Sequence, residues 1–304
     1  MLTLIPVFVI MMAMRLVPAT LQPAVVWLLP NKWRHRASLK KMETFIAAEM
    51  QKQSDKPADA KPGNPPLPSL LTCMMEEVDQ DPMLLTRLLA VLSAGGIYSV
   101  ANFTFSVLLD LAAHPHFLEE IRAEFREKHA AIGGNWNYDA FDSLPKLESA
   151  LKESIRLAPG ALTVYSRVMQ QDYTLENGIV LRKGQFICVD SIGRAEDEAV
   201  HEDARKYDAL RSYNGGLETH LNQPFRGVYG PDLRWGAGRW ACAGRYLATM
   251  LCKFMVVKLL DEYDFQLPGG RRPANSALHE FVFLHPDVQI EMRRRKDSLG
   301  IECS

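Results

Sequence analysis

A long run of apolar residues at helical spacing, beginning after Asp81, most constrains how this chain can fold. Asp81 can cap such a helix and Pro82 suits its first turn, whereas His114-Pro115 ends it. Apolar residues recur at helical spacing in two stretches of this run. The first is Leu84, Leu85, Leu88, Leu89 and Leu92, and the later one is Phe103, Val107, Leu108 and Leu111. A helix of this length and character needs burial on much of its surface. We therefore expect it to lie centrally in a large, mostly helical fold.

Helix patterns continue after the long run, and strand patterns follow them. Helices are predicted over 115–131, closed by Gly133-Gly134, and from about 143 to 157. Short strands are predicted next, with turns at Asn177-Gly178 and Lys183-Gly184. Their expected ranges are 163–168, 173–175, 179–181 and 185–189. This order predicts an α+β fold, mostly α with a small β part.

The last third of the chain mixes helices with a long irregular region. A helix is expected near 196–205, followed by irregular chain over 207–241. A connection of that length inside a compact domain usually serves a function. A strong helix over 243–263 and a closing hairpin of 281–284 with 288–292 complete the expected elements.

Charge and cysteine content exclude several classes of protein. The 304 residues carry 35 Lys+Arg and 36 Asp+Glu, so the net charge of −1 gives no electrostatic case for nucleic-acid binding. The five cysteines are odd in number and form no CxxC pair. They indicate neither a disulfide framework nor a Cys-rich zinc site, and they favour a reducing compartment.

The N-terminal region is apolar but poorly suited to crossing a membrane. The run from Leu2 to Met14 is shorter than the roughly 20 residues that a spanning helix needs. Prolines interrupt the next run, Leu16 to Leu29, and no signal-peptide pattern is present. We expect a buried or membrane-grazing helical pair, with a membrane anchor as the alternative. Basic residues follow over 31–41, and proline-rich 54–69 predicts an exposed loop.

The segment from Trp235 to Arg245 holds the most distinctive chemistry. Cys242 ends a glycine-rich loop and stands where an apolar helix opens, a position that favours the thiolate. Gly236, Gly238 and Gly244 remove side chains where a flat group would approach the backbone. A thiolate, free N–H donors and a cleared surface are what a haem iron with an axial cysteine requires.

Three other interpretations of this segment stay open from the residues alone. Residues 236–241 also fit GxGxxA, a dinucleotide fingerprint that requires a preceding strand. Cys242 could be a catalytic nucleophile, although the histidines show no telling placement. It could also be an inert cysteine buried at a helix start.

Two helical patterns add weaker signals. Glu153 and Arg156 stand three residues apart, so they can pair on one face of a partly buried helix. Gly95 and Gly96 lie inside the long apolar run, at a cost of about 1 kcal/mol each relative to alanine. They indicate close approach by a ligand or by another helix, and Ser99 offers a hydroxyl nearby.

Taken together in order and spacing, these motifs resemble the cytochrome P-450 superfamily of haem-thiolate monooxygenases, in a fungal style. The haem loop Phe-x-x-Gly-x-[Arg/His]-x-Cys-x-Gly is matched by five residues: Trp235, Gly238, Trp240, Cys242 and Gly244. The family's ExxR pair is matched by Glu153 and Arg156, and Arg211 matches the arginine that completes a buried structural triad.

The resemblance extends to the two faces of the haem. The distal motif [Ala/Gly]-Gly-x-[Asp/Glu]-Thr is matched by Gly95, Gly96, Tyr98 and Ser99, of which the last two stand at the catalytic positions. Arg167 stands where the family often has a contact to a haem propionate.

The resemblance implies one incomplete P-450 domain over 1–304, equivalent to the C-terminal two thirds of the fold. It implies haem b bound through Cys242, electrons from an NADPH–cytochrome reductase, and oxidation of a hydrophobic small molecule in secondary metabolism. Family members of this style sit on the cytosolic face of the endoplasmic reticulum membrane. No nucleic-acid partner is implied. The apolar start is expected to match the paired helices that roof the substrate site, and the N-terminal third is expected to be absent.

Three departures from the family pattern suggest alternatives. Tyr98 and Ser99 replace the acid and threonine that relay protons, and Trp240 replaces a basic residue near a propionate. One alternative is a truncated, non-catalytic relic or haem-binding protein. Another is a haem enzyme that rearranges an oxygenated substrate without external electrons.

Overall fold

The computed structural model describes residues 10, 14–54, 70–77, 81–213, 223–228, 234–285 and 287–302. The predicted loop 54–69 therefore lies outside the described residues, apart from Ser54. The chain divides into two compact units, residues 1–98 and 99–304. The expectation of one domain over 1–304 stays a prediction.

The first unit consists of helices, within the residues described. They are α2 (Gln22–Leu28), α3 (Pro30–Ser54), α4 (Leu70–Glu77) and the beginning of α5 (Pro82–Ala113). Ile46, Met50, Met75 and Leu85 form its small buried cluster. The Asp81 carboxylate accepts a hydrogen bond from the Met83 N–H at 2.9 Å, which confirms Asp81 as the cap of α5.

The described part of the apolar N-terminal run is exposed, which contradicts the buried form of the expected helical pair, whereas the membrane-grazing form stays a prediction. Helix α2 has no buried residue, and Leu16, Trp27 and Leu28 are all more than half exposed. Prolines confine α2 to seven residues that are apolar on several sides. So short a helix cannot turn all of its apolar surface toward one neighbour.

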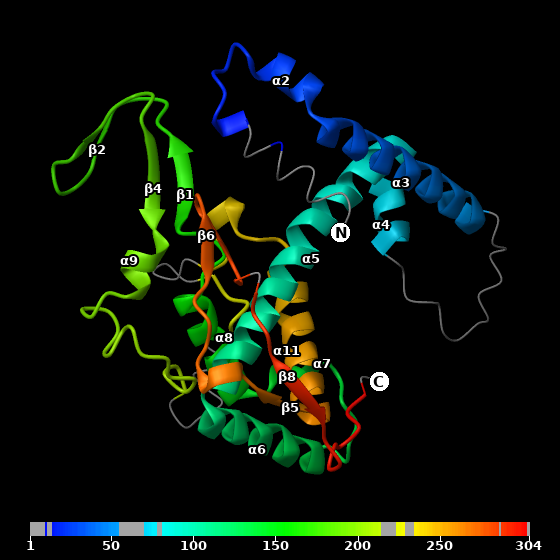
Figure 1. Ribbon diagram of the computed structural model, residues 1–304, viewed down its shortest axis with the longest axis vertical. Coiled ribbons are helices and arrows are strands. Elements are labelled where there is room, and N and C mark those ends of the chain that lie inside the picture. Colours follow the sequence, from blue (N-terminus) through cyan, green and yellow to red (C-terminus); the bar gives the residue numbers. More distant parts are fainter. Residues whose placement is uncertain are drawn as a thin grey trace. The chain divides into compact units, whose positions relative to one another are not determined.

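The second unit packs the C-terminal half of α5 with four further helices (Figure 1). These are α6 (Pro115–Ala131), α7 (Tyr138–Asp142), α8 (Pro145–Leu157) and α11 (Arg245–Glu262). Their shared core includes Val107, Phe125, Phe141, Leu147 and Val256. Helix α6 ends as predicted, because Gly133 and Gly134 adopt positive φ and the Gly134 N–H bonds to the His129 carbonyl at 2.9 Å. Helix α7 was not predicted.

Helix α5 is buried at its C-terminal half and exposed through much of its middle. Val107, Leu108 and Leu111 are fully buried, whereas Val91 is 70% exposed and Ile97 68%. The expectation that much of this helix lies buried is therefore right only for its later turns, which the large core of the second unit contacts. By length and composition alone, α5 is also the one described helix that could cross a membrane.

The described strands pair as four antiparallel two-stranded sheets. They are β1 (Thr163–Val168) with β4 (Phe186–Asp190), β2 (Tyr173–Thr174) with β3 (Val180–Leu181), β5 (Tyr263–Gln266) with β8 (Glu291–Arg294), and β6 (Ser276–Leu278) with β7 (Phe281–Phe283). The register of the first sheet places Thr163 opposite Asp190 and Val168 opposite Phe186. Gly178 and Gly184 take positive φ at the predicted turns.

The predicted closing hairpin is wrong in its pairing. Strand β7 turns back on β6 through His279, which adopts positive φ, and β8 instead joins β5 directly after α11. Strand patterns identified the segments, but pairing depends on which edges the helices leave accessible.

Candidate functional site

The cysteine loop sits at the start of α11, as the sequence predicted. A 3₁₀ turn, η1 (Gly238–Trp240), leads to Cys242, and Gly244 is the N-cap of α11. The Cys242 N–H donates to the Trp235 carbonyl oxygen at 2.7 Å, which closes the loop. The Cys242 side chain is exposed. The alternative of an inert buried cysteine is therefore wrong.

Glycines are required in this loop for two different reasons. Gly236 has φ +78°, and a β-carbon there would come within 3.0 Å of the Trp240 carbonyl oxygen. Gly238 has φ +55° but open space around it. A β-carbon on Gly244 would lie 3.9 Å from the Cys242 sulfur. The glycines thus set the backbone turn and keep side chains away from the thiol.

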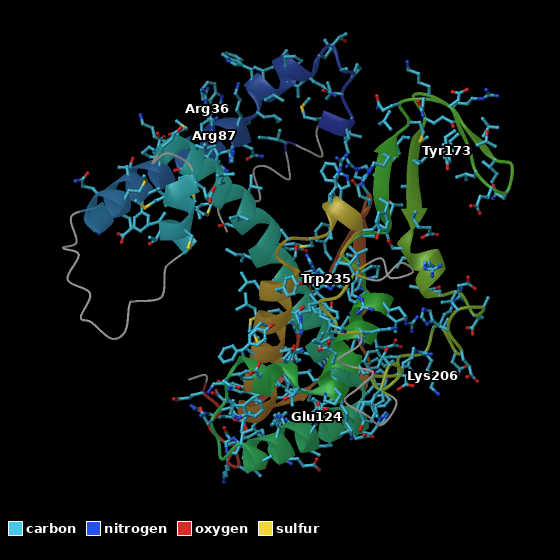
Figure 2. All side chains as sticks on the ribbon, turned by 180° about the vertical axis from the view of Figure 1, so that it is seen from behind. Arg36, Arg87, Glu124, Tyr173, Lys206 and Trp235 are labelled. Atoms are coloured by element: carbon cyan, nitrogen blue, oxygen red, sulfur yellow. The ribbon has the colours of Figure 1, made fainter. Side chains whose placement is uncertain are left out.

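Trp235 anchors the loop in the core (Figure 2). Its indole Nε1–H donates to the Phe225 carbonyl oxygen at 2.5 Å, and the two rings meet edge to face at 5.3 Å. Phe225 is fully buried and stacks on Phe103 of α5 at 5.4 Å. The base of the loop is therefore held by buried aromatic packing, while Cys242 itself faces outward.

Strand β1 brings Arg167 to this loop. The Arg167 guanidinium carbon lies 5.6 Å from the centre of the Trp240 ring, and that of Arg239 lies 5.1 Å away. Trp240 is 66% exposed, so both cations meet it at the surface. The structure therefore joins two residues that the sequence separates widely and that the resemblance places near a haem propionate.

The residues of the cysteine loop fit a haem group. Among the described residues, no three or more His, Cys, Asp or Glu side chains gather in a way that could hold a metal ion. A porphyrin supplies most of the ligands of its iron, so one protein sulfur such as that of Cys242 is enough to hold the group. An exposed sulfur beside Gly244, at the N-terminal end of α11, offers a single soft donor and a surface cleared of side chains.

Glu153, Arg156 and Arg211 form the buried ion triad that the resemblance implied. Glu153 accepts hydrogen bonds from Arg156 Nη2 at 2.7 Å and Nε at 2.8 Å, and from Arg211 Nε at 3.1 Å. Its side chain is 2% exposed. The bidentate pairing and the second arginine compensate the cost of burying the carboxylate.

The same arginines explain why the predicted helix over 196–205 is wrong. Helix α9 (Ser191–Ala195) forms earlier, because the Asp190 side chain caps it by accepting from two backbone N–H groups. The carbonyls that follow bond to guanidinium groups: those of Ala195 and Ala204 to Arg156, and those of Glu202, Asp203 and Lys206 to Arg211. Turns replace a helix here because the tertiary partners take the carbonyl oxygens.

The distal-motif residues lie on α5. Gly95, Gly96, Tyr98 and Ser99 are all exposed, and β-carbons at the two glycines would meet nothing within 4 Å. Partial burial raises the pKa of the Tyr98 phenol, so this group keeps its proton at neutral pH. Gly95 to Tyr98 belong to the first unit, and Ser99 and Cys242 to the second. The catalytic roles of Tyr98 and Ser99 stay predictions.

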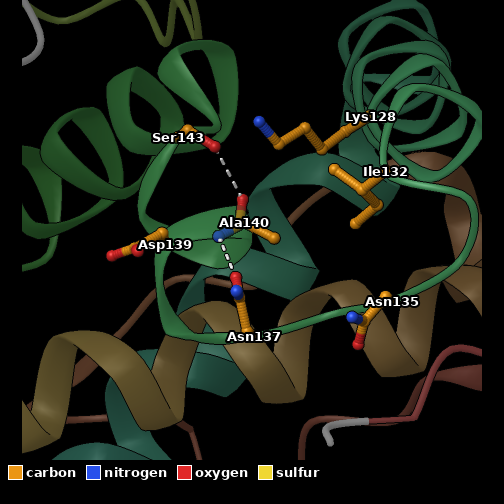
Figure 3. Close-up of a pocket in the computed structure, with 7 residues that line it drawn as sticks. All are labelled: Lys128, Ile132, Asn135, Asn137, Asp139, Ala140 and Ser143. Carbon is orange, nitrogen blue, oxygen red and sulfur yellow. Dashed lines mark hydrogen bonds between the residues drawn. The ribbon is translucent and has the colours of Figure 1, made fainter.

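Two other features do not form functional sites. Turn residues 234–235 stand directly before the GxGxxA match, where a dinucleotide fingerprint needs a strand. In a hollow near the end of α6 (Figure 3), two polar side chains bond locally, since Asn137 Oδ1 accepts from the Ala140 N–H and the Ser143 hydroxyl donates to the Ala140 carbonyl. Its lining comprises Lys128, Ile132, Asn135, Asn137, Asp139, Ala140 and Ser143.

Sequence reasoning missed a second buried ion network behind the cysteine loop. Lys253 of α11 is fully buried and pairs with Asp142 and Glu148. The signal was present in the sequence, because a lysine at this position interrupts the apolar positions of α11. A lysine inside an otherwise apolar helix face requires a counter-charge.

Comparison with known proteins agrees with this geometry. The profile of the cytochrome P450 family matches residues 6–292. The chain is 30% identical, over 95% of its length, to cytochrome P450 monooxygenase AN1598 of Emericella nidulans. It is also 30% identical, over 97% of its length, to cytochrome P450 monooxygenase olcJ of Penicillium canescens. These matches cover 55% and 56% of the relatives, so the chain spans about half of their length.

A further relative and a solved structure extend the comparison. Pyrichalasin C-7 hydroxylase of Pyricularia grisea is 30% identical over 67% of this chain and 41% of its own. The crystal structure of a cytochrome P450 (CYP102L1) aligns with a TM-score of 0.66 and 21% identity, covering 92% of this chain and 60% of that one. The likeness to this solved structure shows the fold of the chain. The chain belongs to the cytochrome P450 family.

Proposed function

We propose that this chain is the haem-thiolate portion of a monooxygenase that oxidises a hydrophobic small molecule. The observation that supports it most is the exposed Cys242 in a glycine loop at the start of α11. When bound, haem supplies dioxygen activation: one oxygen atom enters the substrate, the other leaves as water, and two electrons come from NADPH through a reductase.

The residues of the loop have separable tasks in this proposal. Cys242 holds the iron as a thiolate, and the bond from its N–H to Trp235 fixes the backbone that carries the sulfur. Gly238 and Gly244 leave room for the flat face of the group. Arg167, stacked on Trp240, supplies a positive charge for a propionate in place of the basic residue that Trp240 replaces.

Exposed residues of α5 and the names of the relatives support a hydrophobic substrate. Val91 and Ile97 expose apolar surface on the same helix as the distal motif, which suits an apolar substrate. Relatives carry names such as Pyrichalasin C-7 hydroxylase, which points toward oxidation of secondary metabolites. Ser99 provides the hydroxyl available for proton delivery at the position of the family threonine.

Contact with the endoplasmic reticulum membrane, on its cytosolic face, is a separate part of the proposal. Trp27 and Trp33 are exposed at the junction of α2 and α3, with the charged ends of Lys32 and Arg36 5.4 Å and 5.8 Å from the Trp33 ring. Aromatic and basic side chains of this kind suit the interfacial region of an anionic bilayer. Cosedimentation with phosphatidylserine vesicles should fall in a Trp27→Ser, Trp33→Ser variant; equal binding by both proteins would contradict membrane contact here.

The test of the central proposal is the carbon monoxide spectrum of the reduced, haem-loaded protein. A Soret band at the position typical of thiolate ligation is expected, and Cys242→Ala should abolish it. Cys188→Ala, which removes another exposed cysteine on β4, should leave it intact. A band typical of histidine ligation, or no haem uptake, would overturn the proposal.

The distal residues favour a second candidate function. Tyr98, with its raised pKa, is a weaker acid than the carboxyl it replaces, and so it suits chemistry that needs no proton relay. A haem enzyme that rearranges an oxygenated substrate would form product without NADPH or reductase. Haem uptake with no turnover under either condition would instead indicate a haem-binding relic.

A further inference from the structure

We propose that Lys253 is a positioning residue for the cysteine loop, acting through Glu148 and Phe225. The proposal deepens the function above and rests on it. Lys253 stands on α11, the helix that Cys242 precedes, and its side chain is fully buried. Its ion-pair partners, Asp142 and Glu148, lie outside the loop, so we expect its effect to pass through them.

The ion network around Lys253 is balanced in charge. Lys253 Nζ lies 2.9 Å from Asp142 Oδ1 and in close contact with Glu148 Oε2. Asp142 also accepts from Arg226 Nη1 at 2.6 Å. Two cations therefore face two carboxylates. The opposing charges favour ionised Asp142, whose pKa is lowered even though burial opposes this.

A continuous series of hydrogen bonds leads from this network to the cysteine. The second oxygen of Glu148 accepts from the Phe225 backbone N–H. The Phe225 carbonyl accepts from Trp235 Nε1 at 2.5 Å, and the Trp235 carbonyl accepts from the Cys242 N–H at 2.7 Å. The groups between Glu148 and Cys242 are backbone N–H and carbonyl groups and the indole of Trp235, all of them in the second unit. The position of Glu148 thus sets the position of the loop.

Lys253 is the cation that pairs with the buried Glu148 carboxylate and holds it in place. Without Lys253, this carboxylate, which is 1% exposed, loses the cation that compensates its burial beside Asp142. A buried carboxylate without a cation in contact is costly, so its side chain should shift, and the shift weakens its bond to Phe225. Trp235 and the Cys242 backbone should follow.

The test compares stability with the reactivity of Cys242 in the folded protein. Lys253→Met is measured beside Val257→Ala, which removes buried packing from the same helix but no charge and no hydrogen-bond partner. Iodoacetamide labelling of the haem-free protein is followed peptide by peptide, with Cys188 as the internal reference. We expect the Cys242 rate to change roughly threefold or more in Lys253→Met and to stay constant in Val257→Ala.

A second variant separates positioning from general destabilisation. Glu148→Gln in the Lys253→Met background removes the buried charge but keeps an oxygen to accept from Phe225, so the Cys242 rate should return toward the original. Trp235→Phe, which removes only the donor to Phe225, should alone reproduce the change. The double variant of Trp235→Phe and Lys253→Met should change the Cys242 rate little more than either single variant. Both substitutions interrupt the same series of hydrogen bonds from Glu148 to Cys242.

The outcomes distinguish this proposal from the proposed function. An unchanged Cys242 rate in both Lys253→Met and Trp235→Phe, or additive effects of the two, would overturn the positioning role. Should Lys253→Met fail to fold, Trp235→Phe decides alone. If the original protein shows no thiolate spectrum, the proposed function is overturned. The labelling experiment needs no haem, so it still tests the positioning role of Lys253. In loaded protein, the thiolate band should weaken in Lys253→Met and recover with Glu148→Gln.

Discussion

Arg167 and Trp240 meet in a cation–π contact, with the guanidinium carbon 5.6 Å from the ring centre. Arg167 comes from strand β1 and Trp240 from the turn before Cys242. The contact ties the first sheet to the cysteine loop and holds a positive charge beside it.

We expect Arg167→Gln to weaken haem retention by roughly ten- to a hundredfold, since a charged hydrogen bond to a propionate contributes about 1.5–3 kcal/mol. Transfer of haem to apomyoglobin measures the loss rate. Arg182→Gln is the matched control, because Arg182 is an exposed arginine that pairs with Asp172 at 3.2 Å away from the loop. Equal loss rates in all three proteins would remove Arg167 from the site. Trp240→Leu should have a smaller effect, because it keeps the charge and removes only its stacking partner.

Breaking the Glu153 triad should destabilise the second unit strongly. Arg156→Lys loses the bidentate contact and leaves Glu153, 2% exposed, with a poorer partner. We expect a loss of about 3–5 kcal/mol in the free energy of unfolding, measured by urea denaturation. Arg205→Lys changes an 81% exposed arginine paired with Glu196 and should change stability little. A triad variant that unfolds like the control would show that the pairing contributes little.

Gly236 should tolerate alanine less well than other glycines of similar backbone. Gly236→Ala combines a cost of about 1–2 kcal/mol for positive φ with a β-carbon 3.0 Å from the Trp240 carbonyl. Gly178→Ala, at φ +86° with open space, has the backbone cost alone. Thermal unfolding should place Gly236→Ala below Gly178→Ala, and only Gly236→Ala should reduce haem binding. The reverse order would mean that the loop relaxes around the added carbon.

Asp110 gives a pH dependence whose direction is fixed by burial. Burial raises its pKa from 3.8 to about 6, opposed by its ion pair with Arg272. Between these values the folded protein binds the proton that the unfolded chain has released. The free energy of unfolding should therefore fall, by up to about 3 kcal/mol, as the pH rises from about 4 to above 6.

Denaturant unfolding at several pH values measures this slope, and Asp110→Asn should flatten it. Some slope should remain, because burial also raises the pKa of Glu124, to about 7, and acts in the same direction. Parallel profiles for the two proteins between pH 4 and 7 would contradict the assignment to Asp110. Asp110→Asn also removes the charged partner of Arg272, which changes the free energy of unfolding at every pH. The two proteins are therefore compared by how steeply this free energy changes with pH.

Local signals in the sequence predicted much of the fold and part of the site. Helix α6 occupies the predicted 115–131, since Pro115 and the glycine pair mark its ends within a few residues. Strand β1 also occupies the predicted range 163–168. The pairing of Glu153 with Arg156 follows from helical spacing, and the position of Cys242 follows from the helix that begins three residues later.

Tertiary structure decided what depends on distant partners. The carbonyls of Glu202 and Ala204 bond to Arg211 and Arg156 where a helix was predicted, and β8 pairs with β5 instead of β7. The contact of Arg167 with Trp240 and the burial of Lys253 between two carboxylates likewise join segments far apart in the chain. By itself the sequence determined the ends of α6, the turns at Gly178 and Gly184 and the cysteine loop, because neighbouring residues fix those. It left undetermined the partners of buried charges that lie far apart in the chain, such as Lys253, because burial and counter-charge exist only once the chain has packed.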